Sequence, residues 1–312
     1  MRRVAALLAA ALLGAGLVAC GGGGAEPGAP RGATLVLDFQ PNAVHSGIYA
    51  AQANGYFRDE GLDLKIQEPS STADNAKLLA SGRADFAVMD ISDFGIARER
   101  GLDLVPIAAI VQLPLASVIA RDPNEIRTPA DLAGKTVGVT GVPSDDAVLD
   151  TVLRSGGVNP SDVHRVTIGF NAVADLAAGK IDAATAFWNA EGVQLHQMGI
   201  PIREFRVDQF GAPRYPELLV VARSGSEALG SKLTAALSRG YELLGRNPDQ
   251  ALNDLLEEVP GLDRATQRAQ LDALTSAEAF SLGNSISTPR LDRATLDRWQ
   301  AWATQAGLLP AG

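Results

Sequence analysis

The chain has 312 residues, 46% of them hydrophobic, so it can bury ordinary cores and, at roughly 100–200 residues per domain, form two domains. Acidic residues outnumber basic ones, 36 against 27, and the formal net charge is −9. Because such a chain repels nucleic acid and anionic lipid, we expect no nucleic-acid function.

The N-terminal residues are typical of a secretory signal. Arg2 and Arg3 precede an apolar run over residues 4–17, which is too short and too rich in alanine and glycine to predict a membrane-spanning helix. We expect the signal to comprise residues 1–19. Its removal deletes both arginines and no acid, so the net charge changes from −9 to −11. Residues 20–32, rich in glycine and proline, predict a flexible tether.

Cys20 is the only cysteine of the chain, so it cannot form an internal disulfide. The sequence Leu17-Val18-Ala19-Cys20 resembles the lipobox of bacterial lipoproteins, which implies diacylation of the Cys20 thiol. The alternative is an ordinary cleaved signal with an incidental cysteine. The tether favours the lipoprotein, anchored at the outer face of the cytoplasmic membrane or located in the periplasm.

Apolar strands alternate with helices along the first part of the fold. The first strand, residues 35–37, is followed by Pro41, which cannot donate to a sheet, and Asn42, which can cap a helix. Further strands are predicted at 62–66, 86–89 and 104–111, and helices at 73–81 and 94–100. This alternation indicates an α/β fold with a parallel sheet.

A second α/β unit is predicted after the first. Its strands are expected at 136–139, 163–167, 183–187 and 202–206, and its helices at 147–154, 173–178 and 191–197. Segment 218–222 predicts a buried strand returning to the first unit, followed by helices at 226–244, 248–258, 264–279 and 291–306. We therefore predict one lobe of residues 33–116 plus 222–312, a second lobe of residues 117–221, and a ligand cleft between them.

A weak internal repeat bears on the number of lobes. Residues 79–87 resemble residues 176–184, since each segment is a helix end, a glycine, a basic residue, an acid and then a strand. This similarity favours two similar lobes. The alternative is that helix–glycine–strand joints look alike in many proteins.

The loops at the strand ends are the expected site, because ligands of open α/β sheets bind outside the carboxyl ends of the strands. The first loop offers Phe39, Asn42 and His45, an apolar face with hydrogen-bonding groups beside it. The loops after the other strands add Ser71, Asp90, Gln112, Gly141, Ser144 and Tyr215 as candidate ligand-binding residues. Gly141 and Ser144 could present backbone N–H groups at a helix start, although Ser144, Asp145 and Asp146 could equally be helix caps.

The loop after strand 183–187 carries Trp188, Asn189 and Glu191 together in an aromatic-poor chain. An indole can stack on a planar ring, and a carboxylate accepts hydrogen bonds from an amino group or a protonated ring nitrogen. This combination suits a nitrogen heterocycle better than a sulfonate. The alternative is that Trp188 belongs to the core and Glu191 stabilises a helix N-terminus.

Enzyme signatures are absent from the sequence. It has no GxGxxG after a strand, no Walker loop, no nucleophile elbow and no metal-spaced cluster of histidine and cysteine. We predict a binding protein that is not an enzyme, with no catalytic residue, no cofactor and no metal.

Several segments together resemble one known family. They are Asp38-Phe39-Gln40-Pro41-Asn42-x-x-His45-x-Gly47-x-Tyr49, Gly55-Tyr56-Phe57, Gly61-Leu62-Asp63, Gly82-Arg83-Ala84-Asp85-Phe86, Gly141-Val142-Pro143-Ser144, Phe187-Trp188-Asn189-Ala190-Glu191 and Tyr215-Pro216-Glu217-Leu218. Across nearly the whole mature chain they resemble the thiamine-pyrimidine-precursor binding proteins of ABC importers, in the type II periplasmic binding superfamily. Phe39 departs from the tryptophan that the family often has there.

The resemblance implies a two-lobed, lipid-anchored solute-binding protein. Its ligand would be an aminopyrimidine, hydroxymethylpyrimidine or formylaminopyrimidine, stacked between aromatic side chains and held by Glu191. It implies a monomer that delivers this ligand to an ABC permease and its ATPase. Related families bind sulfonates such as taurine, nitrate or riboflavin, so these ligands remain alternatives.

A related enzymatic branch makes the pyrimidine from pyridoxal phosphate and a histidine equivalent to His45. That branch carries a cysteine-rich iron-binding motif, whereas the sole cysteine here lies in the leader. We therefore predict no synthase activity.

Overall fold

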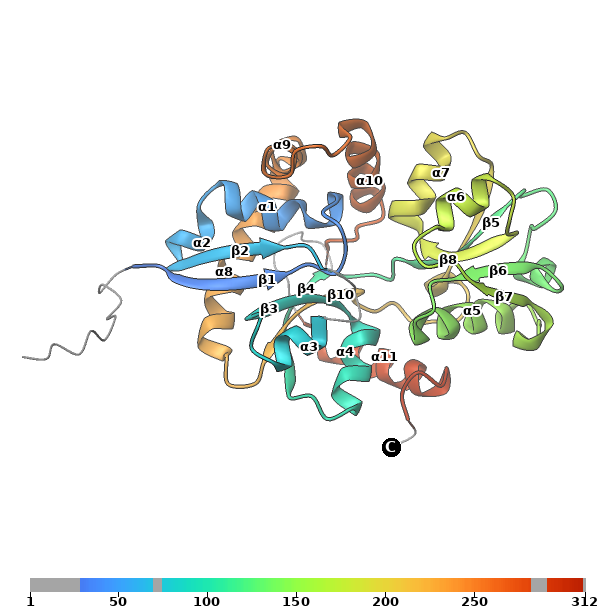
Figure 1. The fold of residues 1–312 in the computed structure, drawn as a ribbon, viewed down its shortest axis with the longest axis horizontal. Coiled ribbons are helices and arrows are strands. Elements are labelled where there is room, and N and C mark those ends of the chain that lie inside the picture. The colour runs from blue at the N-terminus through green and yellow to red at the C-terminus, as the bar shows by residue number, and fades with distance from the viewer. Residues whose placement is uncertain (1–28, 70–74, 282–290, 311–312) are drawn as a thin grey trace, which may run out of the picture.

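Two five-stranded sheets form the framework of the protein (Figure 1). The computed structural model describes residues 29–69, 75–281 and 291–310. Within these residues, helices cover both faces of each sheet. The α/β class and the two α/β units predicted from the alternation of strands and helices are confirmed.

The first sheet combines strands from the N-terminal part of the chain with one strand that returns from much later. Its order is β2 (Leu62–Gln67), β1 (Arg31–Val36), β3 (Phe86–Asp90), β10 (Leu218–Arg223) and β4 (Leu104–Val111). β2 and β3 run parallel to β1, whereas β10 is antiparallel to both β3 and β4, so the sheet is mixed and not wholly parallel as the alternation predicts. The returning strand predicted at 218–222 is β10.

Two groups of helices cover the first sheet (Figure 1). One face carries α1 (Ser46–Ala53), α2 (Tyr56–Asp59), α8 (Glu227–Arg246), α9 (Pro248–Glu258) and α10 (Arg264–Ser276). The other face carries α3 (Asn75–Ala80), α4 (Ile91–Glu99) and α11 (Arg293–Gln305). Trp299 and Trp302 of α11 are buried, as their spacing predicts.

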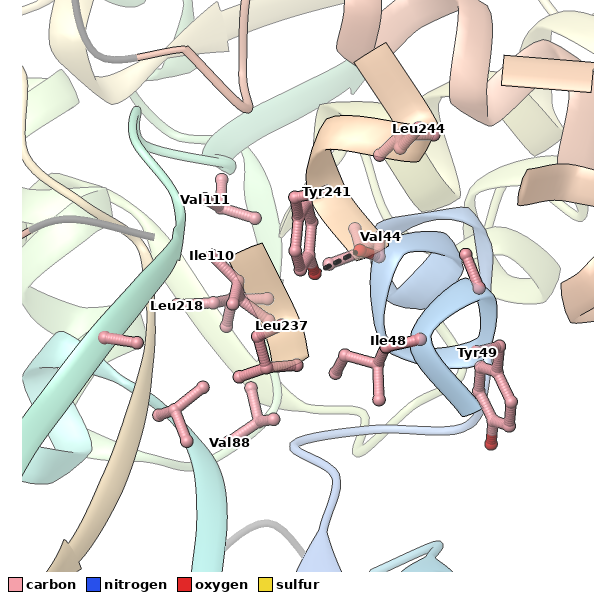
Figure 2. Close-up of a cluster of buried hydrophobic side chains, with 14 of the residues drawn as sticks. Val44, Ile48, Tyr49, Val88, Ile110, Val111, Leu218, Leu237, Tyr241 and Leu244 are labelled. Atoms are coloured by element: carbon pink, nitrogen blue, oxygen red, sulfur yellow. Dashed lines mark hydrogen bonds between the residues drawn. The ribbon is translucent and has the colours of Figure 1, made fainter. Parts of the chain in front are cut away.

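Helix α8 holds the start of α1 in place (Figure 2). The two helices touch through glycines, because a Cβ at Gly240 would lie 2.1 Å from the carbonyl oxygen of Gly47. The neighbouring Tyr241 donates its hydroxyl to the carbonyl oxygen of Val44 at 3.2 Å. Val44 lies in the loop between β1 and α1, so this packing fixes one of the two loops expected to bind the ligand.

The second sheet has the order β7 (His164–Thr167), β6 (Thr136–Val139), β8 (Ala183–Phe187), β5 (Ala116–Arg121) and β9 (Ile202–Arg206). β5 is not among the strands predicted from the sequence, because its fully apolar run is only three residues long, 118–120. Helix α5 (Pro143–Ser155) covers one face, and α6 (Ala172–Ala177) and α7 (Val193–Gln197) cover the other.

The two sheets share their strand order and strand directions. β7 and β8 run parallel to β6, and β5 is antiparallel to β8 and β9, as in the first sheet. The repeated joint also recurs, since Asp85 accepts from the backbone N–H of Thr34 at 2.8 Å and Asp182 accepts from that of Thr136 at 2.8 Å. This correspondence supports the interpretation of the repeat as two similar units.

The chain passes between the sheets twice, over residues 112–115 and over residues 207–217. Glu217 connects these passages, because its Oε2 accepts from the backbone N–H groups of Leu115 at 2.6 Å and Ala116 at 3.2 Å. We propose that each sheet with its helices is one lobe and that the two passages form the hinge. The lobe border predicted after residue 221 falls inside β10, all of whose residues pair in the first sheet.

Candidate functional site

A cavity of about 120 Å³ lies between the two sheets, at the ends of their strands. Its walls come from the loops after β1, β3, β6, β7 and β8, from residues at the start of β5 and from the residues that lead into β10. The predicted site residues that line it are Phe39, Asn42, Asp90, Ser144, Asn189, Glu191 and Tyr215. The two loops that the sequence singled out therefore face the same space.

The loop after β1 is held by its own histidine. His45 has an exposed fraction of 0%, its Nε2 lies 2.8 Å from Oδ1 of Asp38, and its Nδ1 accepts from the backbone N–H of Asn42 at 3.2 Å. Because Nδ1 is an acceptor, the ring proton is on Nε2 and is donated to Asp38. Oδ1 of Asn42 in turn accepts from the backbone N–H of Val44 at 2.9 Å. His45 does not line the cavity but fixes Asp38 and Asn42, which do.

The loop after β8 is a single π-helical turn, Trp188–Gly192, in which the indole is turned away from the cavity. Trp188 is 1% exposed, and its Nε1–H donates to the carbonyl oxygen of Pro114 at 3.0 Å. The guanidinium of Arg206 lies 3.9 Å from the ring centroid. The stacking platform expected from Trp188 is therefore not part of this cavity, and the side chain belongs to the core, as the alternative interpretation holds.

Asn189 and Glu191 of the same turn present hydrogen-bond acceptors to the cavity. Oε2 of Glu191 accepts from the backbone N–H of Phe187 at 3.0 Å, and burial raises the pKa of Glu191 above its ordinary value. Asn189 is 1% exposed, and its Oδ1 has no hydrogen-bond partner among the described residues. A buried acceptor without a donor costs about 1–3 kcal/mol, so this oxygen is suited to a donor from a ligand.

The remaining predicted residues lie elsewhere. Gln112 is buried, and its Nε2 donates to the carbonyl oxygen of Ala109 at 2.9 Å. Its backbone N–H donates to the carbonyl oxygen of Ala279 at 2.7 Å. Gly141 does not line the cavity; its φ of 99° marks the turn between Thr140 and Val142, which do. Ser71, like Cys20 and the leader, lies outside the described residues.

Sequence reasoning missed several residues that line the cavity: Asp38, Asp93, Thr140, Asp145, Phe170, Thr185, Phe187 and Glu217. Most of the acids among them share a signal, because they lie within a few residues of a strand end. The signal for Phe170 is an aromatic residue beside Gly169 in a chain with few aromatics. In the sequence Asp145 was indistinguishable from a helix cap.

Phe39 and Phe170 meet at the cavity from opposite lobes. Their ring centroids are 5.4 Å apart, with the ring planes at 62°. Phe170 is 67% exposed, so this pair forms an edge-to-face contact where the cavity borders solvent. Phe39 and Phe170 thus offer aromatic faces to a planar ligand at this side of the cavity.

Carboxylates dominate the polar lining of the cavity. Asp93 has its pKa raised to about 6, first by burial and then by the charge of Asp145. Burial, as the largest cause, raises the pKa of Glu217 to about 7 and the pKa of Asp90 well above its ordinary value. No lysine, arginine or histidine is among the described residues that line the cavity. Across residues 29–69, 75–281 and 291–310, no group of three or more histidine, cysteine or acidic side chains could hold a metal ion.

Comparisons with known proteins agree with one another. The family model described as NMT1/THI5 like matches residues 42–251. A formylaminopyrimidine-binding protein of Halalkalibacterium halodurans is 36% identical over 228 residues, 71% of this chain and 69% of that protein. A putative thiamine biosynthesis protein of Haemophilus influenzae is 32% identical over 89% of this chain and 88% of that protein. A 4-amino-5-hydroxymethyl-2-methylpyrimidine phosphate synthase of Saccharomyces cerevisiae is 29% identical over 53% of this chain and 48% of that protein.

Solved structures with the same fold include sulfonate-binding proteins. The periplasmic aliphatic sulphonate binding protein of Escherichia coli has a TM-score of 0.70 at 17% identity, covering 91% of this chain and 95% of that one. The alkanesulfonate-binding protein of Xanthomonas axonopodis pv. citri has a TM-score of 0.69 at 19% identity, covering 91% of this chain and 96% of that one. The type II periplasmic binding fold predicted from the sequence is confirmed.

Proposed function

The chain belongs to the NMT1/THI5-like family, and from this premise we propose that it is the solute-binding component of an ABC importer for an aminopyrimidine precursor of thiamine. Hydroxymethylpyrimidine and formylaminopyrimidine are the ligands we propose. The 36% identity to a formylaminopyrimidine-binding protein supports this class.

The observation that carries the proposal is the acceptor-rich lining of the cavity. Glu191 and the unpartnered Oδ1 of Asn189 offer acceptors to an exocyclic amino group. Phe39 from one lobe and Phe170 and Phe187 from the other offer apolar faces to the ring. A small aminopyrimidine can use both kinds of surface at once.

The same lining disfavours the anionic alternatives. Sulfonate and nitrate need donors and positive charge, whereas the polar groups here include Asp38, Asp90, Asp145, Glu191 and Glu217. A sulfonate placed among these carboxylates would meet like charge without a compensating cation. Similarity to sulfonate-binding structures below 20% identity thus extends to the fold alone.

Cavity size disfavours riboflavin. The volume of about 120 Å³ equals roughly ten water-sized spheres. That is the room of a single ring with short substituents, and the three fused rings and ribityl chain of riboflavin exceed it.

The synthase relatives raise an enzymatic alternative, in which His45 would be consumed. In this structure His45 is fully buried, and its two ring nitrogens form hydrogen bonds, one with the carboxylate of Asp38 and the other with the backbone N–H of Asn42. The chain also has a single cysteine, Cys20. We therefore propose ligand binding without bond-making. Formation of the pyrimidine phosphate from pyridoxal phosphate, with loss of His45, would show the opposite.

Transport would follow from closure of the two lobes. A ligand that contacts Phe39 and Asp90 in the first lobe and Asn189 and Glu191 in the second stabilises the arrangement in which both lobes reach it. The ligand-bound monomer would then dock on a membrane permease driven by its ATPase. No cofactor enters this scheme.

Attachment to the membrane would come from the leader. Among the residues that the structure describes, no helix has both the length and the apolarity to span a bilayer. We propose that residues 1–19 are removed and that Cys20 is diacylated, which places the protein in the cell envelope. Incorporation of labelled fatty acid in the wild type, and its loss together with release of the protein in Cys20→Ser, would test this.

Isothermal titration calorimetry tests the ligand. We expect binding of hydroxymethylpyrimidine or formylaminopyrimidine with one site per chain, and no heat with taurine, nitrate or riboflavin. Binding of taurine in preference to both pyrimidines would overturn the proposal. So would the absence of heat and of thermal shift with either pyrimidine.

A further inference from the structure

The cavity lining carries charge of only one sign. Carboxylates reach it from both lobes and from the hinge: Asp38, Asp90 and Asp93 from the first lobe, Asp145 and Glu191 from the second, and Glu217 from the hinge. No basic side chain is among the described residues that line it. Some of these carboxylates accept hydrogen bonds within the protein, as Asp38 does from His45 and Glu217 from Leu115, but these donors carry no balancing charge within the lining. Protons or a cationic ligand would supply that positive charge.

Asp145 is the carboxylate of the second lobe that opposes those of the first. Its Oδ2 accepts from the backbone N–H and the hydroxyl of Thr140, at 2.5 and 2.6 Å, which fixes it at the start of α5. After burial, its charge is the next cause of the raised pKa of Asp93, and it also contributes to the raised pKa values of Asp90 and Glu191. Bringing the lobes together therefore opposes like charges across the cavity.

Neighbouring ionisable groups do not neutralise this charge within the cavity. Arg100 lowers the pKa of Asp93 but does not line the cavity. Arg165 is paired with Asp146 beside the start of α5, and neither of them lines the cavity. Tyr215 does line the cavity, and burial raises its pKa well above the ordinary value, so it is neutral.

Two buried oxygens mark where donors are needed. Oδ1 of Asn189, on a side chain 1% exposed, and Oδ1 of Asp90 have no hydrogen-bond partner among the described residues. One belongs to each lobe, and both residues line the cavity. A ligand that satisfies them brings donors to both sides.

We propose that the cavity binds its ligand as a cation, with the aminopyrimidine protonated on a ring nitrogen between Asp93 of the first lobe and Asp145 and Glu191 of the second. This inference rests on the proposed function and adds the charge state of the ligand. The protonated ring offers donors at its amino group and at the ring nitrogen, and its positive charge offsets the repulsion among the carboxylates as the lobes close. The step is a proton transfer alone: a solvent proton adds to the lone pair of the ring nitrogen, and no other bond changes.

Proton uptake makes affinity depend on pH. Where the free ligand is neutral, binding takes up as much as one proton per ligand, so affinity falls by up to about tenfold for each unit of rising pH. A neutral bound ring takes up none.

Nitrogen NMR of the bound ligand reads the charge directly. With hydroxymethylpyrimidine labelled with ¹⁵N at both ring positions and the full mature chain at pH 8, we expect one ring nitrogen at the chemical shift of the free ligand in acid. Binding with both nitrogens at their neutral shifts would overturn the inference and leave the proposed function standing. Absence of any binding would overturn the proposed function and this inference with it.

Substitution of Asp145 tests whether its carboxylate contributes to binding of the cationic ligand. We expect Asp145→Asn, which keeps an oxygen for Thr140, to bind hydroxymethylpyrimidine roughly tenfold to a hundredfold more weakly and with a smaller pH dependence. Asp146→Asn, the next residue on the same helix, is the matched control and should stay within about threefold of wild type. Unchanged or tighter binding by folded Asp145→Asn would show that its charge only repels its neighbours, which contradicts the inference.

Discussion

The loops after β1 and β8 both face the cavity, and each buries a ring side chain. They differ in whether a polar atom is left without a hydrogen-bond partner. In the loop after β1 His45 is turned inward, and in the loop after β8 Trp188 is turned inward. The first loop is internally complete, since both nitrogens of His45 are hydrogen-bonded. The second leaves Oδ1 of Asn189 without a partner among the described residues. Substitution of His45 in the first loop should therefore act on stability, and substitutions of the polar groups in the second loop should act on affinity.

The strongest test of this comparison is His45→Ala. The change removes a fully buried ring and leaves the carboxylate of Asp38 and the backbone N–H of Asn42 without their partner. We expect the free energy of unfolding to fall by about 3–4 kcal/mol, measured by urea denaturation.

His164→Ala is the matched control, because His164 is exposed on β7, and it should change stability by less than about 0.5 kcal/mol. If His45→Ala kept its stability and lost only affinity, His45 itself would be a ligand contact and the comparison would fail.

Glu191→Gln tests the second loop. The amide keeps the size of the side chain but replaces a carboxylate with a group that also carries a donor. We expect affinity for hydroxymethylpyrimidine to fall roughly a hundredfold, measured by calorimetry, because a charge-assisted hydrogen bond is lost. Stability at pH 8 should not fall, since burial penalises the charged form of Glu191.

Glu204→Gln serves as control for this change. Glu204 also lies in the second lobe, where it pairs with Arg206 at 3.4 Å and does not line the cavity. Its affinity should stay within about threefold of wild type. Equal losses in both variants would remove the special role of Glu191.

The sequence predicted the loops that meet but not the orientation of their side chains. Pro41 and Asn42 locate the end of the first strand through local geometry, so that loop was predictable. The inward turn of Trp188 depends on Pro114 and Arg206, which lie far away in the sequence, so no local pattern could show it. The negative charge of the cavity likewise comes from carboxylates that lie far apart in the sequence, so no local pattern could show it.

Glu217→Gln tests the proposed hinge, in which Glu217 links the two passages between the lobes. The raised pKa of Glu217, about 7 against 4.5, means that the folded state binds this proton more tightly than the unfolded chain. Its contribution to stability is therefore present below about pH 4.5 and is lost as the pH rises towards 7. Since glutamine keeps an oxygen for Leu115 and Ala116, we expect the variant to be about 2 kcal/mol more stable than wild type at pH 8 and similar at pH 4.5.

Thermal unfolding at the two pH values measures this difference. Glu257→Gln, an exposed change on α9, should shift stability by less than about 0.5 kcal/mol at either pH. A Glu217→Gln variant that is less stable than wild type at pH 8 would show that the charged carboxylate holds the two passages together.

Trp188→Phe is the mildest change and separates scaffold from ligand platform. Phenylalanine loses the hydrogen bond to Pro114 and part of the contact with Arg206, so we expect a loss of about 1 kcal/mol in stability and a change in affinity below about threefold. Phe39→Ala, which removes a ring that lines the cavity, should instead lower affinity about tenfold. Calorimetry on both variants decides between the two roles. A loss in Trp188→Phe as large as that in Phe39→Ala would mean that the indole reaches the ligand when the lobes close, and the second loop would then contribute its largest side chain to binding after all.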